Sequence, residues 1–123
     1  MYLESYRELI SWLSQVSAGQ QLYLMLESLI PVGEEKGFLF SGKNENDPLK
    51  YIVFDDNVIV DGILDIYRDN VVLEFNVRLK KDIVQKNCQM ISHPNIQPFS
   101  FYDFKDIIFT INFINGSELK LCK

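Results

Sequence analysis

The chain has 123 residues, a formal net charge of −5 at pH 7 and an apolar fraction of 47%. This length favours one domain, residues 1–123, and nine Phe with six Tyr supply enough apolar surface for a packed core, which argues against disorder. No apolar segment approaches the ~20 residues that span a bilayer, and the N-terminus does not lead a basic region into an apolar run. We therefore expect a cytoplasmic protein that makes no contact with membranes.

The first thirty residues have the apolar spacing of helices. Between residues 2 and 16 the apolar side chains recur every three or four positions. Ser5 followed by Glu8 has the pattern of a capping box, although Tyr2 and Leu3 also permit an earlier start of the helix. A second stripe covers residues 20–30 and stops at Pro31, which cannot continue a helix. This predicts two helices, although alternating leucines in the second segment also permit a strand.

Residues 51–80 predict three consecutive antiparallel strands, after a short strand at 38–40. Apolar and polar residues alternate from 71 to 80, which is the signature of a half-buried strand. The alternation from 58 to 67 is less strict, because the outer face of that strand mixes apolar residues with acids. That face carries Ile59, Asp61, Ile63, Asp65 and Tyr67.

A two-residue turn at Asp69-Asn70 is expected to join the last two of these strands, because both residues tolerate turn conformations and the apolar faces then match. This register would place Asp61 opposite Arg78, a favourable pair. It would also place Asp65 opposite Glu74, an unfavourable pair that stability alone would not select. The hairpin before it could have a loop of two or three residues, and the sequence leaves both open.

The C-terminal third is less regular. Residues 81–98 predict a short strand and a long loop, whereas residues 107–113 alternate again. A three-residue loop from Ile114 to Gly116 would set Ile111 against Leu119, with Gly116 in the left-handed conformation of a bulged turn. We therefore expect an α+β fold: an antiparallel sheet of five or six strands, a meander plus a C-terminal hairpin, with two N-terminal helices packed on one face.

Motifs for catalysis are absent from the sequence. The only histidine, His93, precedes a proline in an expected loop, where a solvated side chain is the commoner interpretation. The patterns GxGxxG, GxxxxGK[ST] and HExxH do not occur, and Cys88 and Cys122 lack companions at metal-ligand spacing. The sequence thus predicts no catalytic residue, no cofactor, no metal site and no enzyme. A small hydrolase using loop carboxylates with His93 is an alternative.

Acidic charge is concentrated in the middle of the chain. Between residues 45 and 74 there are eight acidic and two basic residues, a formal charge of −6. Phosphate contacts need a basic surface, so direct nucleic-acid binding is disfavoured, whereas a negative surface attracts basic proteins. These acids could also simply keep the sheet soluble. The residues predicted to bind a partner are Asp55, Asp56, Asp61, Asp65, Tyr67, Asp69 and Glu74.

A small acidic α+β protein that lacks catalytic motifs and carries such an acidic region at residues 55–74 resembles the immunity proteins of bacterial toxin systems, including those of contact-dependent growth inhibition. The resemblance implies that the chain binds a cognate toxin domain, often a basic nuclease, and blocks its active site or substrate surface. A different class of function is also compatible with the acidic charge and the mixed face. In this alternative the chain is a secretion or assembly chaperone that acts as a dimer.

Overall fold

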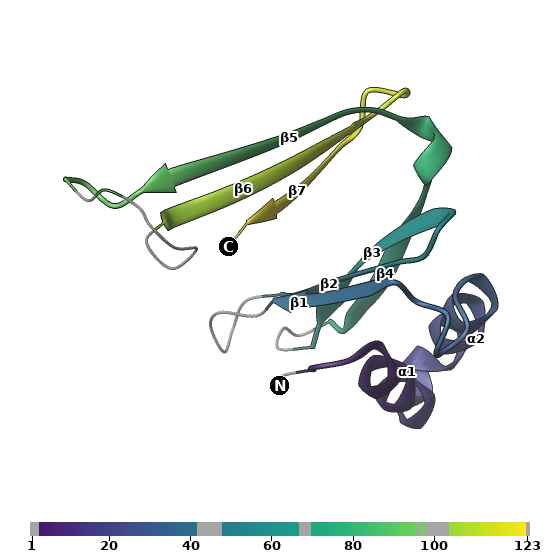
Figure 1. Ribbon diagram of the computed structural model, residues 1–123. Helices are drawn as coiled ribbons and strands as arrows, with labels where there is room; N and C mark the ends of the chain where they lie inside the picture. The colour runs from purple at the N-terminus through teal and green to yellow at the C-terminus, as the bar shows by residue number, and fades with distance from the viewer. Residues whose placement is uncertain (1–2, 42–47, 67–69, 96, 98–103, 123) are drawn as a thin grey trace. The chain divides into compact units, whose positions relative to one another are not determined.

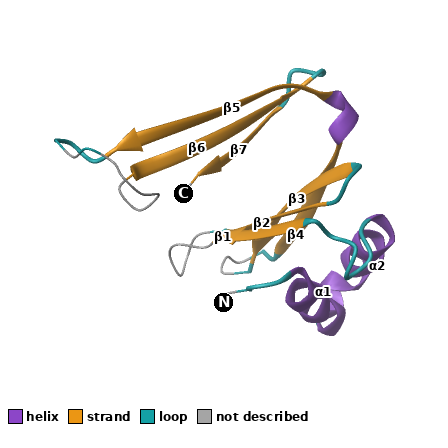
Figure 2. Ribbon diagram, viewed as in Figure 1, coloured by secondary structure: helices purple, strands orange, loops and turns teal. Residues whose placement is uncertain are grey.

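The computed structural model describes residues 3–41, 48–66, 70–95, 97 and 104–122 (Figure 1). The chain divides into two compact units, residues 1–80 and 81–123. The predicted α+β class is confirmed, with N-terminal helices and antiparallel strands (Figure 2). The expected strand number and single sheet are wrong, because the described strands form one sheet of four and one of three. The expectation of one domain stays a prediction.

The N-terminal helices are α1 (Tyr6–Gln15) and α2 (Gln20–Leu29), joined by the short 3₁₀ turn η1 (Ser17–Gly19). The helix alternative for residues 20–30 is therefore correct. The predicted cap explains why α1 begins at Tyr6: Ser5 Oγ accepts the Glu8 N–H at 3.2 Å, and the Glu8 carboxylate accepts the Glu4 N–H at 2.8 Å.

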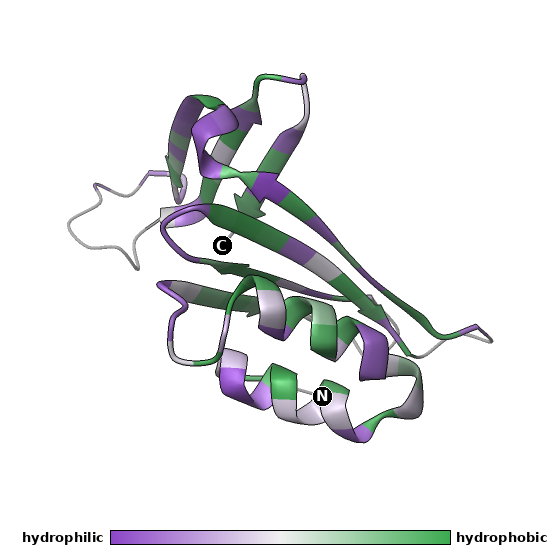
Figure 3. Cartoon of the chain, turned by 90° about the vertical axis from the view of Figure 1, so that its right-hand side faces the viewer, coloured by the Kyte–Doolittle hydropathy of each residue, from purple (hydrophilic) through white to green (hydrophobic). Residues whose placement is uncertain are grey.

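The first unit's sheet is a four-stranded antiparallel meander. Its strands are β1 (Gly37–Ser41), β2 (Leu49–Phe54), β3 (Val58–Asp65) and β4 (Val72–Leu79), in that spatial order. Val53 pairs with Val60, so the β2–β3 hairpin has the shorter of the two possible loops. Figure 3 shows hydrophobic and hydrophilic residues interspersed along these strands, as a sheet with one buried face requires.

The predicted register of β3 with β4 is wrong by two residues. Leu64 pairs with Leu73, and Asp65 lies opposite Val72, whereas the predicted register set Leu64 opposite Phe75. The predicted turn at Asp69-Asn70 cannot be compared directly, because Asp69 lies outside the described residues. A shift of two leaves every side chain on its predicted face, which is why the alternation could not distinguish the registers. The observed register also avoids the unfavourable pair of Asp65 with Glu74, since Glu74 faces Ile63 instead.

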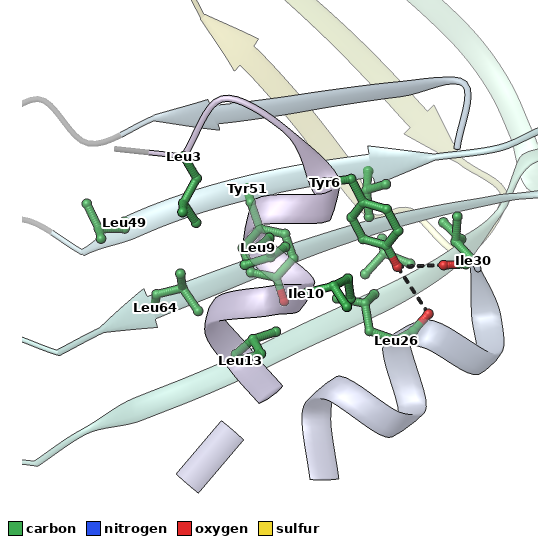
Figure 4. Close-up of a cluster of buried hydrophobic side chains, with 12 residues drawn as sticks. Leu3, Tyr6, Leu9, Ile10, Leu13, Leu26, Ile30, Leu49, Tyr51 and Leu64 are labelled. Carbon is green, nitrogen blue, oxygen red and sulfur yellow. Dashed lines mark hydrogen bonds between the residues drawn. The ribbon is translucent and has the colours of Figure 1, made fainter. Parts of the chain in front are cut away.

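The core of the first unit lies between its helices and one face of its sheet (Figure 4). The Tyr6 hydroxyl ties α1 to the end of α2, because it donates to the backbone oxygens of Ile30 at 2.7 Å and Leu26 at 3.2 Å. Ile30 is the C-cap of α2, where backbone acceptors lack helical partners, and the Leu26 oxygen also accepts the Ile30 N–H at 2.9 Å. The buried cluster comprises Leu3, Tyr6, Leu9, Ile10, Leu13, Leu26, Ile30, Leu49, Tyr51, Val53, Val60 and Leu64.

The second unit's sheet contains β5 (Ile83–Ser92), β6 (Phe104–Phe113) and β7 (Glu118–Cys122), in that order and antiparallel, after the 3₁₀ turn η2 (Lys80–Asp82). The expected short strand and loop at 81–98 are wrong for 83–92, since β5 has ten residues. Its middle is exposed on both faces, so no alternation marked it. The β6–β7 hairpin is confirmed: Ile111 pairs with Leu119, and Gly116 has φ +86°.

Candidate functional site

The face of the first sheet that points away from the helical core carries most of the predicted site residues. On β3, Val60 and Leu64 are completely buried in the core. The odd-numbered residues from Ile59 to Asp65 therefore belong to the opposite face, because strand side chains alternate. We call this opposite side the outer face. Its described members are Leu39, Ser41, Lys50, Ile52, Phe54, Ile59, Asp61, Ile63, Asp65, Val72, Glu74, Asn76 and Arg78.

Asp61 and Arg78 form an ion pair on the outer face. The register places Asp61 opposite Asn76, and Arg78 is the diagonal neighbour two positions further along β4. The Arg78 guanidinium nevertheless reaches the Asp61 carboxylate and donates a hydrogen bond to it. The side chains are only 20% and 23% exposed, so the pair is partly shielded from water. The Asp61 charge is thus largely neutralised within the protein.

Asp65 and Glu74 differ sharply in accessibility. Asp65 ends β3 and is 7% exposed, whereas Glu74 in the middle of β4 is exposed. The two carboxylates are not opposite each other in the ladder, since Asp65 faces Val72 and Glu74 faces Ile63. Of these two predicted site residues, only Glu74 presents its charge to solvent.

The β2–β3 turn uses one of its two acids for its own structure. Asp55 Oδ1 accepts hydrogen bonds from the backbone N–H groups of Asn57 and Val58, each at 2.8 Å. This is an Asx-type turn, a backbone reason for aspartate at this position. The neighbouring Asp56 is exposed. Tyr67 and Asp69, the remaining predicted site residues, lie outside the described residues.

The described site residues therefore do not form one acidic cluster. The structure brings Asp61 to Arg78 and Asp55 to its own turn, and it leaves Asp56 and Glu74 as the exposed carboxylates. Sequence reasoning missed a cation–π contact in the same unit, in which Lys80 Nζ lies 4.9 Å from the centre of the Phe54 ring. That ring covers Gly37, whose missing side chain makes the space. The only sequence signal for this contact was Gly37, a glycine at the end of a strand.

Charge differs strongly between the two units. Residues 1–80 contain thirteen acidic and seven basic side chains, a formal charge of −6, whereas residues 81–123 contain four and five, a charge of +1. Exposed acids of the first unit also lie outside the sheet, at Glu4, Glu8 and Glu34. The negative potential consequently belongs to the first unit as a whole.

Metal ligands and His93 are the groups on which the sequence expectations about catalysis depend. They contain no group of three or more His, Cys, Asp or Glu side chains that could hold a metal ion, and His93 is exposed. Neither described helix has the length and apolar character that a membrane span requires. Comparison with protein-family models, curated proteins and solved structures found no match to this chain.

Proposed function

We propose that this chain is a cytoplasmic, non-catalytic binding protein that neutralises a basic protein partner, as the immunity proteins of bacterial toxin systems do. The observation that carries the proposal is the separation of charge, −6 in residues 1–80 against +1 in residues 81–123. A field of one sign accelerates encounter with a partner of the opposite sign. A toxin domain with a basic active-site surface is such a partner.

The exposed part of the outer face supports this proposal. At the β4 edge, Val72 is 42% exposed, and the exposed Glu74 follows it on the same face. Apolar area beside charged groups is the usual composition of a protein interface. Asp56 adds an exposed carboxylate at the β2–β3 turn. Asp55 holds its own turn and adds negative charge rather than a contact, whereas Arg78 largely neutralises the charge of Asp61.

The first experiment is affinity capture of the tagged chain from a lysate of its own cells at low salt, followed by elution in a salt gradient. We expect one basic protein in stoichiometric amount, released at moderate salt because the attraction is screened. Its toxic activity should then fall as the chain is titrated against it. Capture of no basic protein, or full toxin activity at excess chain, would count against the proposal.

A matched pair of charge reversals then locates the surface. Glu74→Lys changes an exposed strand residue of the acidic unit, and Glu118→Lys makes the same change on an exposed strand residue of the other unit. Glu74→Lys should slow association with the captured partner severalfold at low salt, and Glu118→Lys should change it little. Equal effects would show that the acidic unit is not the contact surface.

A further inference from the structure

β5 is an edge strand of the second unit's sheet, and it is unusually accessible. In the described part of the chain, β6 pairs with one side of it and no strand pairs with the other (Figure 1). Every residue from 84 to 91 is exposed, including Val84 at 62% and Met90 at 45%. An edge of this kind presents a row of backbone N–H and C=O groups to which another strand can bind.

The regular part of β5 is symmetric about one residue. Register irregularities lie between Ile83 and Gln85 and between Ile91 and Ser92, so the uninterrupted ladder runs over residues 85–91. Bulges limit pairing along an edge, which leaves these seven residues as the stretch available to a new strand. Cys88 is its midpoint, and its thiol is free and exposed.

We infer that β5 pairs antiparallel with β5 of a second copy of this chain, about a two-fold axis that passes beside Cys88. Only this register overlaps both seven-residue stretches completely, and a two-fold interface uses the same surface on each copy. The two three-stranded sheets would join into one sheet of six strands. This inference goes beyond the proposed function and does not depend on it.

The side chains of β5 fit a second copy better than they fit a basic partner. Lys86 is the only charged residue of the strand, and in this register it lies opposite Met90 of the second copy. The two Lys86 side chains are then four positions apart along the strand, ~13 Å, so they repel little. A strand from the basic partner would instead bring positive charge towards Lys86.

The same register keeps the two faces of the joined sheet distinct. Cys88 pairs with Phe109 and Met90 with Ile107 in the ladder to β6, so these four side chains share one face. A symmetric register with Cys88 opposite its copy places that face on the same side in both chains. On the other face, Asn87 would lie opposite Gln89 of the second copy, where two amides can exchange hydrogen bonds.

Opposite charges introduced at Met90 test the pairing. Sedimentation equilibrium of the full chain under reducing conditions should show a dimer in the wild type. Met90→Glu would place a carboxylate opposite Lys86 twice per dimer and should lower the dissociation constant, by up to about tenfold, whereas Met90→Lys should raise it by a similar factor. A wild type that stays monomeric at several hundred micromolar, or two variants that shift the constant in the same direction, would overturn the inference.

Disulfide cross-linking tests the position of the axis. Residues directly opposite each other across antiparallel strands have Cα atoms ~4.5–5.5 Å apart, within the range that a disulfide spans. Three variants of a Cys122→Ser chain are compared, each with one remaining cysteine. The first keeps Cys88, and the other two carry Cys88→Ser together with either Lys86→Cys or Met90→Cys. On mild oxidation, the variant that keeps Cys88 should form a covalent dimer most rapidly. A faster reaction at position 86 or 90 would exclude the axis at Cys88. Partner capture by the first unit is a separate measurement, so the two proposals can fail independently.

Discussion

The ring of Tyr51 lies across the backbone of Gly62 on the neighbouring strand. The two residues are direct cross-strand partners in the β2–β3 ladder, and a Cβ at position 62 would overlap Tyr51 ring atoms. An aromatic side chain that covers a cross-strand glycine compensates for the packing that glycine lacks. Tyr51 is 1% exposed, so this pair forms the centre of the sheet's buried face.

Gly62→Ala should destabilise the fold by roughly 1–3 kcal/mol, because the new methyl group forces the Tyr51 ring out of a packed core. The free energy of unfolding from urea denaturation measures this. In a Tyr51→Val background the space above residue 62 is open, so the same alanine should have a much smaller effect. Additive effects of the two substitutions would contradict the proposed overlap.

The same chemical change at two buried tyrosines should have different results. Tyr6→Phe removes the hydroxyl that donates to Leu26 and Ile30 and should cost about 1–2 kcal/mol. The Tyr51 hydroxyl is buried and has no hydrogen-bond partner among the described residues. Tyr51→Phe should therefore leave stability unchanged or raise it slightly. A larger loss at Tyr51 than at Tyr6, measured by urea denaturation, would contradict this assignment.

Stability should fall in alkaline solution. Burial raises the pKa of Tyr51 above its ordinary value of 10.0, and burial followed by the charges of Glu27 and Glu35 raises the pKa of Tyr6. Above pH 10 the unfolded chain loses these protons while the folded chain keeps them. Above pH 10 the free energy of unfolding should thus decrease with pH, by at most about 1.4 kcal/mol per pH unit for each tyrosine. Below pH 10 the contribution of the two tyrosines to the free energy of unfolding should be constant. The double variant Tyr6→Phe, Tyr51→Phe should lack this part of the slope.

Asp55 should act through its oxygen rather than its charge. Asp55→Ala removes the acceptor of two backbone hydrogen bonds and should destabilise the fold by about 1–2 kcal/mol. Asp55→Asn keeps a side-chain oxygen at the same position, so it should retain most of that stability. Thermal or urea unfolding of the two variants distinguishes the roles, and an equal loss in both would indicate that the negative charge is what matters.

The Asp61–Arg78 pair should contribute a modest and salt-dependent coupling. A double-mutant cycle with Asp61→Ala and Arg78→Ala should give about 0.5–1 kcal/mol at low salt, since both side chains are partly shielded. The coupling should decrease in 1 M NaCl. A coupling of zero at low salt would mean that the ion pair contributes nothing measurable to the fold.

The sequence alone determined the features that depend on short-range pattern. Ser5 and Glu8 indicated one of the two possible starts of the first helix, because a cap needs an oxygen acceptor and a carboxylate at fixed spacing. Gly116 selected the β6–β7 loop, because a left-handed residue is needed there. The alternation in β3 and β4 assigned their faces. These are local requirements of the backbone, and neighbouring residues are sufficient to reveal them.

Only the tertiary structure decided the remaining features. The alternation of β3 and β4 is equally compatible with registers that differ by two residues, so the observed register and the separation of Asp65 from Glu74 could not be predicted. The sequence indicated only a short strand in the region of β5, because a strand exposed on both faces has no apolar alternation to mark its full length. Whether each acidic side chain is paired or exposed depended on its neighbours in the folded chain. Arg78 neutralises Asp61 from a diagonal position, and Asp56 and Glu74 remain exposed, because long-range pairing determines which charges meet.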